Sequence, residues 1–211
     1  SIKMNSADFQ KGGFSPEDSI QVAKLFSDSG IDNIEISGGT YEQPRLLGLD
    51  KVSINPKRSE NRKESTIARE AYFLSYAEEI AKVVNIPLMV TGGFRTKEGM
   101  EAALADGACE IVGVGRPLCA NPYAIKELLA GQIDELPKYE KTLSIGPWWL
   151  SPTSPFRLIQ AINAFSAQAW FYQQIKKMGK GLMPDLTLKP WKAFREDAKA
   201  DQEAIKEYQN F

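Results

Sequence analysis

The segment VTGGFRTKEGMEAALADGACEIVGVGRPL, residues 90–118, holds two glycine turns that are each followed by an arginine. The turns read Gly92-Gly93-Phe94-Arg95 and Gly113-Val114-Gly115-Arg116. An apolar run typical of a buried strand precedes each turn, and a segment with helical spacing lies between them. Two strand–turn–helix units in succession predict parallel strands, because the helix returns the chain to the same end of the sheet.

The same alternation extends outward from this segment. Strands are predicted at residues 2–4, 31–37, 86–90 and 110–114, and helices at residues 15–29, 65–84, 96–106 and 121–130. Ser15 followed by Pro16 is a typical helix start, and Gly30 is a typical helix end. The whole pattern predicts an α/β fold of four parallel βα units.

An internal repeat points to a particular kind of parallel sheet. Gly30 and Gly107 are 77 residues apart, and so are Gly38 and Gly115. This spacing equals two βα units of about 38 residues, which is near the unit size of a (β/α)₈ TIM barrel. Four of the eight strands of such a barrel are present, so the sequence predicts half a barrel.

The C-terminal part of the chain has no strand pattern. A connector rich in tryptophan and proline lies at residues 145–152, and long helices are predicted at residues 156–178 and 189–208. We therefore expect two domains. Residues 1–131 would form the half barrel, and residues 132–211 would form a helical C-terminal extension that packs on it.

Composition excludes several classes of function. The 211 residues carry a net charge of -1, so neither a nucleic acid nor a membrane surface is an expected partner. The two cysteines, Cys109 and Cys119, are too few for a disulfide framework, which favours a cytoplasmic setting, and no metal site is expected. The chain has no histidine, so acid–base chemistry would need other residues or a cofactor.

The two glycine turns are candidates for an anion site. Backbone N–H groups at such turns can point together at a phosphate, and arginine offers a fixed fork of donors. In TIM barrels, the loops after the last two strands often bind phosphate. The alternative is that these glycines only turn the chain at strand ends and that both arginines are solvated.

Several motifs occur in an order that resembles a known family. They are Lys3–Phe9, Gly12–Asp18, Gly30–Asp32, Glu35–Glu42, Arg69–Phe73, Val90–Arg95, Gly113–Leu118 and, in the tail, Trp170–Ile175 and Gly179–Gly181. This series resembles the second half of the Old Yellow Enzyme family, the FMN-dependent NADH:flavin oxidoreductases. The resemblance covers essentially the whole chain and implies the C-terminal half of a TIM barrel.

The resemblance also implies roles for individual residues. Lys3 would lie beside the flavin pyrimidine ring and stabilise negative charge there on reduction. Phe94 would lie against the dimethylbenzene edge of the flavin, although core packing explains this residue equally well. The FMN phosphate would be held by the remaining residues of the set, namely Gly92, Gly93, Arg95, Gly115 and Arg116.

No residue of the chain is a certain catalytic residue. Tyr41 is a candidate, since it follows the strand at residues 31–37 on the face where barrel active sites form. It could reach flavin or substrate, or it could anchor the long polar loop. The substrate-binding histidine pair of the family, and its proton-donating tyrosine, have no match in the chain.

These features together predict a fragment of an oxidoreductase. The complete enzyme would pass hydride from NADH or NADPH through FMN to an electron-poor acceptor, such as an α,β-unsaturated carbonyl, or to oxygen. The missing N-terminal half-barrel, or a companion chain, would complete the site, and a homo-oligomer is a further arrangement. The alternatives are another phosphate-binding barrel enzyme, such as an isomerase or lyase, and a non-catalytic half-barrel interaction module.

Overall fold

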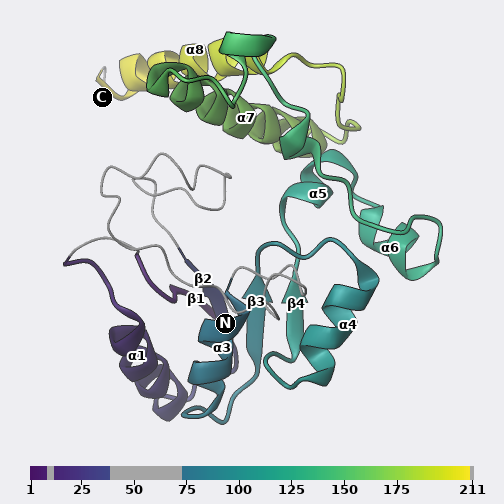
Figure 1. The fold of residues 1–211 in the computed structure, drawn as a ribbon. Helices are drawn as coiled ribbons and strands as arrows, with labels where there is room; N and C mark the ends of the chain where they lie inside the picture. Colours follow the sequence, from purple (N-terminus) through teal and green to yellow (C-terminus); the bar gives the residue numbers. More distant parts are fainter. Residues whose placement is uncertain (9–11, 39–72, 210–211) are drawn as a thin grey trace. The chain divides into compact units, whose positions relative to one another are not determined.

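The computed structural model describes residues 1–8, 12–38 and 73–209 (Figure 1). The chain divides into two compact units. Unit 1 is Ser1–Gly115 with Lys126–Leu136, and unit 2 is Arg116–Ile125 with Pro137–Phe211. We describe each unit by itself, and the expected domain boundary after residue 131 stays a prediction.

Unit 1 is built on a sheet of four parallel strands. They are β1 (Ile2–Asn5), β2 (Ile34–Ser37), β3 (Leu88–Thr91) and β4 (Ile111–Gly113), in the spatial order β1-β2-β3-β4. Sequential strands lie side by side, as they do in a TIM barrel. The prediction of an α/β fold with four parallel strands alternating with helices is confirmed, and the strand order is consistent with half a barrel.

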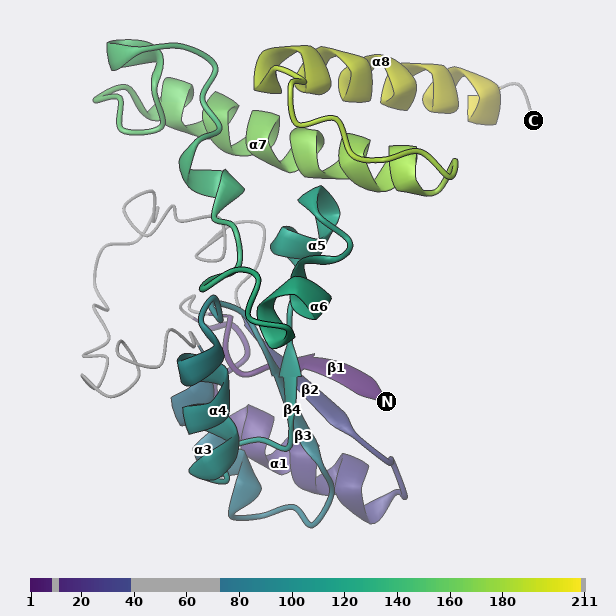
Figure 2. The ribbon, with the colours of Figure 1, turned by 90° about the vertical axis from the view of Figure 1, so that its right-hand side faces the viewer.

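Three helices cover one face of this sheet (Figures 1 and 2). They are α1 (Pro16–Asp28), α3 (Leu74–Ala81) and α4 (Lys97–Ala105). The core between helices and sheet contains Ile34 and Ile36 of β2, Leu88 and Val90 of β3, and, from the helices, Ala23, Leu74, Ala77, Ile80 and Ala103. Since successive strand residues point to opposite faces, the other face carries the residues between them.

Glycines end the helices where the repeat predicted. Gly30 follows α1 with a φ of 80°, and Gly107 follows α4 with a φ of 68°. Both values lie in the left-handed region, which glycine adopts without steric cost. At the start of α1, the side chain of Ser15 accepts a hydrogen bond from the Asp18 amide, and the Asp18 side chain accepts one from the Ser15 amide. This is a capping box.

The segment after β4 differs from the expected helix at residues 121–130. Two short helices occur there, α5 (Arg116–Ala120) and α6 (Ala124–Leu129). Asn121 separates them, and its Oδ1 accepts a hydrogen bond from the Tyr123 amide at 3.0 Å. The sequence signal for a helix start at Asn121 therefore marked a turn between two helices.

Unit 2 is helical, as expected for the C-terminal part. Besides α5 it contains the 3-10 helices η2 (Tyr139–Lys141) and η3 (Trp148–Leu150) and the long helices α7 (Arg157–Met178) and α8 (Pro190–Gln209). Residues 179–189, the return segment, run back along α7, so α8 follows the same direction as α7 (Figures 1 and 2). No helix among the described residues is long and apolar enough to cross a membrane.

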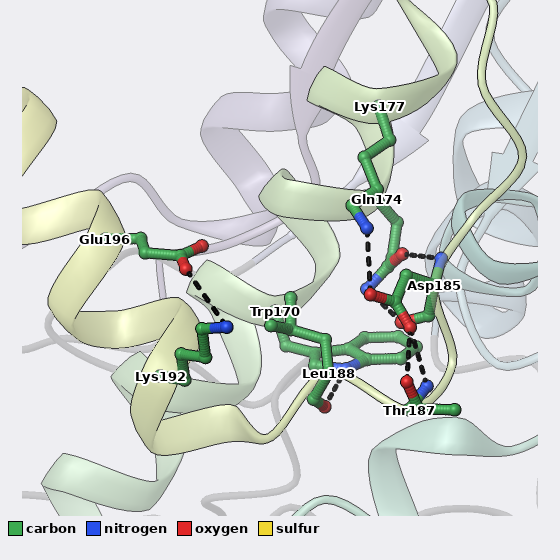
Figure 3. A network of polar contacts seen from close by, with 8 residues as sticks. All are labelled: Trp170, Gln174, Lys177, Asp185, Thr187, Leu188, Lys192 and Glu196. Atoms are coloured by element: carbon green, nitrogen blue, oxygen red, sulfur yellow. Dashed lines mark hydrogen bonds and ion pairs between the residues drawn. The ribbon is translucent and has the colours of Figure 1, made fainter.

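Side chains of α7 hold the return segment in place (Figure 3). Gln174 donates to the Asp185 carbonyl at 3.1 Å and accepts from the Asp185 amide at 2.6 Å. The indole of Trp170 donates to the Leu188 carbonyl at 2.9 Å. Lys177 forms an ion pair with Asp185 at 2.8 Å. The bonds from Gln174 and Trp170 pair backbone groups of the return segment, and the Asp185 carbonyl also accepts from the Leu188 amide within that segment at 3.3 Å.

Candidate functional site

The carboxyl end of β3 carries the first predicted glycine turn. Gly92 has a φ of 128° and Gly93 a φ of 95°, and side chains with a Cβ rarely adopt either value. No described residue accepts a backbone hydrogen bond from either amide. The turn thus requires glycine at both positions and leaves two N–H groups able to meet an acceptor.

Phe94 and Arg95 lie immediately after this turn, and both are buried. Phe94 is 1% exposed and belongs to the core of unit 1. Arg95 is 6% exposed, its Nη1 donates to the Phe94 carbonyl at 2.7 Å, and its own carbonyl accepts from the Leu136 amide at 2.7 Å. The core packing expected for Phe94 is therefore present, and its contact with a flavin edge stays a prediction.

The second predicted turn follows β4, the neighbour of β3. Gly113 pairs with Thr91 across the two strands, so both glycine turns leave the same edge of the sheet. Gly115 ends the segment of unit 1 that contains β4, and Arg116 begins unit 2 as the first residue of α5. In unit 2, Arg116 lies 4.0 Å from the Glu140 carboxylate.

Lys3 lies on β1, on the sheet face opposite α1, α3 and α4, which we call the helix-free face because none of these three helices covers it (Figure 1). Its neighbour Met4 is buried in the core, so the pleat places Lys3 on the other face. Lys3 pairs in register with Glu35 of β2, and its ammonium donates to the Glu35 carboxylate at 2.8 Å. The lysine is therefore held by an ion pair and is not a loosely solvated terminal residue.

The pKa of the Glu35 carboxyl group lies below its ordinary value. Partial burial raises the pKa of its carboxyl group, but the hydrogen bond and the charge of Lys3, together with the nearby Thr91 hydroxyl, lower it further than burial raises it. The Thr91 Oγ1 atom is buried and has no hydrogen-bond partner among the described residues. We therefore assign most of the lowering to Lys3.

Packing against β3 requires glycine at position 113. A Cβ at this position would lie 1.8 Å from the Thr91 Oγ1 atom, which is far inside van der Waals contact. Thr91 has a short side chain that cannot move far, so glycine is needed for β3 and β4 to pair as they do. Gly113 and Glu35 belong to motifs recognised in the sequence, but the sequence indicated no role for either residue.

The structure brings some of the predicted site residues together and leaves others apart. Gly92, Gly93 and Gly115 share the carboxyl edge of neighbouring strands, and Lys3 lies on the same sheet's helix-free face. Arg116 belongs to the other unit. Tyr41, the catalytic candidate, lies outside the described residues.

Comparisons with known proteins were made on sequence and on structure. No family model matches the chain. The NADH-dependent flavin oxidoreductase iliE of Hypocrea jecorina is 41% identical over 53% of this chain and 26% of its own length. The NADH-dependent flavin oxidoreductase iccE of Talaromyces variabilis is 32% identical over 76% of this chain and 37% of its own length. The chain is a homologue of NADH-dependent flavin oxidoreductases.

A bacterial relative extends this likeness over more of the chain. The NADH oxidase of Thermoanaerobacter brockii is 30% identical over 84% of this chain and 25% of its own length. A solved 2-naphthoyl-CoA reductase matches 64% of this chain and 19% of its own, with 23% identity and a TM-score of 0.48, which is too weak to support a conclusion. The resemblance to the Old Yellow Enzyme family is confirmed, while the chain spans about a sixth to a third of the curated relatives' lengths.

Proposed function

We propose that this chain is the FMN-binding part of an oxidoreductase that takes hydride from NADH or NADPH and passes it to a small electron-poor acceptor. The relatives named as NADH-dependent flavin oxidoreductases support the cofactor and the reductant. The observation that carries the proposal is the Gly92–Gly93 turn, with two positive φ values, beside Gly115 on a sheet whose helix-free face bears Lys3.

The donors present fit FMN by their chemistry. FMN joins an anionic phosphate to a ring that accepts hydride and gains negative charge at its pyrimidine edge. The amides of Gly92 and Gly93 suit the phosphate, since glycine lets the backbone approach an anion closely. The Lys3 ammonium suits the pyrimidine edge, because a fixed cation stabilises developing negative charge.

Arg95 and Arg116 would contribute differently to phosphate binding. The buried Arg95 already directs its Nη1 to the Phe94 carbonyl, so we expect only its remaining donors to face a phosphate. Arg116 follows Gly115 directly in the chain and would provide the second cation. Tyr41 remains our candidate for contact with flavin or substrate.

We further propose that other strands complete the barrel and bring the substrate-binding residues. Among the described residues, β1 pairs only with β2 and β4 only with β3, so each leaves one strand edge open. Open edges tend to pair with other strands. The partner would be a further segment of the same protein or a companion chain, or a second copy of this one. We place the protein in the cytoplasm, a setting in which its two free thiols persist.

The first test measures FMN binding by the protein as the cell produces it, with a matched pair of variants. Gly93→Ala adds a Cβ at a φ of 95° in the proposed site, and Gly107→Ala adds one at a φ of 68° at the amino end of β4. Both cost about 1–2 kcal/mol of stability. We expect Gly93→Ala to weaken FMN binding at least about tenfold, and Gly107→Ala to leave the affinity unchanged.

Two outcomes would contradict the proposal. Equal affinities of both variants and the unaltered protein would remove the Gly92–Gly93 turn from the phosphate site. Absence of FMN binding in the unaltered protein would favour the non-catalytic module. Intact-mass spectrometry of the same sample identifies any companion polypeptide that contributes the missing strands.

A further inference from the structure

We propose that Glu35 is a positioning residue for Lys3. The Glu35 carboxylate would fix the Lys3 ammonium on the helix-free face of the sheet and would weaken the positive potential that this ammonium exerts on the flavin. This inference rests on the proposed function, since it assigns a role toward bound FMN. Glu35 itself is not expected to touch the substrate, and its effect would be exerted through Lys3.

The strand register fixes the pair. Lys3 and Glu35 are directly opposite each other on the parallel strands β1 and β2, and their charged atoms are 2.8 Å apart. The Lys3 side chain is 56% exposed and the Glu35 side chain 20%. The carboxylate is therefore the anchored member of the pair, and the long lysine side chain would otherwise be spread over many rotamers.

The pair stands out from its surroundings. Lys3 and Glu35 are the only charged residues in the four described strands, and every other residue of those strands is neutral. An ion pair whose lysine side chain is 56% exposed contributes little to stability, because solvent weakens the attraction and ordering the long side chain costs entropy. A role in charge placement explains why the two charges occur together here.

The electrostatic consequence follows from the sign of the second charge. A lysine ammonium near the pyrimidine edge favours the reduced flavin, and a carboxylate 2.8 Å from that ammonium opposes this effect. Glu35→Gln removes the negative charge but keeps an oxygen that can accept from Lys3. Glu35→Ala removes both the charge and the acceptor, so it also frees the lysine.

The test measures the midpoint potential of FMN bound to the protein, by equilibration with a reference dye. We expect Glu35→Gln to shift the ratio of reduced to oxidised flavin at a fixed potential about tenfold toward reduced, equivalent to about 30 mV for a two-electron couple. In a Lys3→Met background the same substitution should shift the ratio less than about threefold, because Glu35 then loses the hydrogen bond and the charge that favour its ionised form, and burial favours the neutral carboxyl.

A matched control separates a local effect from a general change in charge. Glu101→Gln removes the same charge from the Lys97–Glu101 pair, 3.6 Å apart on helix α4, and should leave the potential unchanged. Equal shifts for the two glutamate substitutions, or a Glu35→Gln shift that persists without Lys3, would overturn the inference while FMN binding stands. Failure of the unaltered protein to bind FMN would instead overturn the proposed function and this inference with it.

Discussion

Gln174 of α7 is predicted to be the main clamp on the return segment that leads to α8. Its side chain is fully buried and uses both of its polar atoms on one residue, Asp185. The amide oxygen accepts from the Asp185 N–H at 2.6 Å, and the amide nitrogen donates to the Asp185 carbonyl at 3.1 Å. Such a pair of bonds fixes both the position and the orientation of the peptide chain.

The expected cost of Gln174→Ala can be built from its parts. Each lost hydrogen bond contributes about 1 kcal/mol. The Asp185 amide is left partly buried without an acceptor, whereas the Asp185 carbonyl keeps its bond from the Leu188 amide. The space left by the truncated side chain adds roughly another 1 kcal/mol. We therefore expect a loss of about 3 kcal/mol in the free energy of unfolding of unit 2, measured by urea denaturation and circular dichroism.

Hydrogen exchange gives a second and more local measurement. The Asp185 amide should be protected in the unaltered protein and should exchange rapidly in Gln174→Ala. Gln174→Glu keeps the accepting oxygen but lacks the donor, so it should lose stability while retaining more of this protection.

The adjacent Gln173 supplies the control, since it is only partly buried and the structure gives its side chain no hydrogen bond among the described residues. Gln173→Ala should change stability by less than about 0.5 kcal/mol. Equal effects of the two alanine variants would refute the clamp.

Three further predictions concern stability and reactivity. Trp170→Phe removes the buried indole donor but keeps an aromatic ring, so it should lower the free energy of unfolding by about 1–2 kcal/mol. The control Trp191→Phe, at a 47% exposed site, should have a negligible effect. Urea denaturation measures both variants. The hydrogen bond from Lys177 is the main cause that lowers the pKa of Asp185 to about 2 from its ordinary 3.8. Its contribution to stability should therefore be complete above about pH 5 and should disappear as the pH falls through 4 to 2, whereas Asp185→Asn should show no such component in an acid titration. Burial raises the pKa of the Cys109 thiol to about 11, so iodoacetamide at pH 8 should label it at least about 100-fold more slowly in the native protein than in urea; rapid native labelling would contradict its placement in the core.

The sequence was sufficient for the order of the elements. Period-two and helical spacing of apolar residues predict strands and helices locally, and Ser15 and Gly30 mark the ends of α1 through contacts within one turn. The split between α5 and α6 was not predicted, because these sequence patterns carry only local information. Asn121 is a good helix cap and an equally good turn residue, and only the packing of the neighbouring segments decides between these two uses.

The site could be predicted only in part. Glycine at 92 and 93 is required by the backbone of the turn itself, so the motif carried that information. The ion pair between Lys3 and Glu35 depends on the register between two strands 32 residues apart, which no local pattern reveals. The burial of the Arg95 side chain depends likewise on the surrounding core. The sequence alone could not decide whether this side chain is solvated or contacts a phosphate.

One face of the sheet carries the core residues, and the other carries the Lys3–Glu35 pair. The strand register determines which residues lie on which face. Met4 and Ile36 are buried under the helices, while Lys3 and Glu35, each one residue earlier, meet on the helix-free face. Moving β1 by one residue would turn Lys3 into the core and leave a buried charge without its partner, at a cost of several kcal/mol. The apolar residues that form the core therefore also fix the position of the lysine that we propose to contact the flavin.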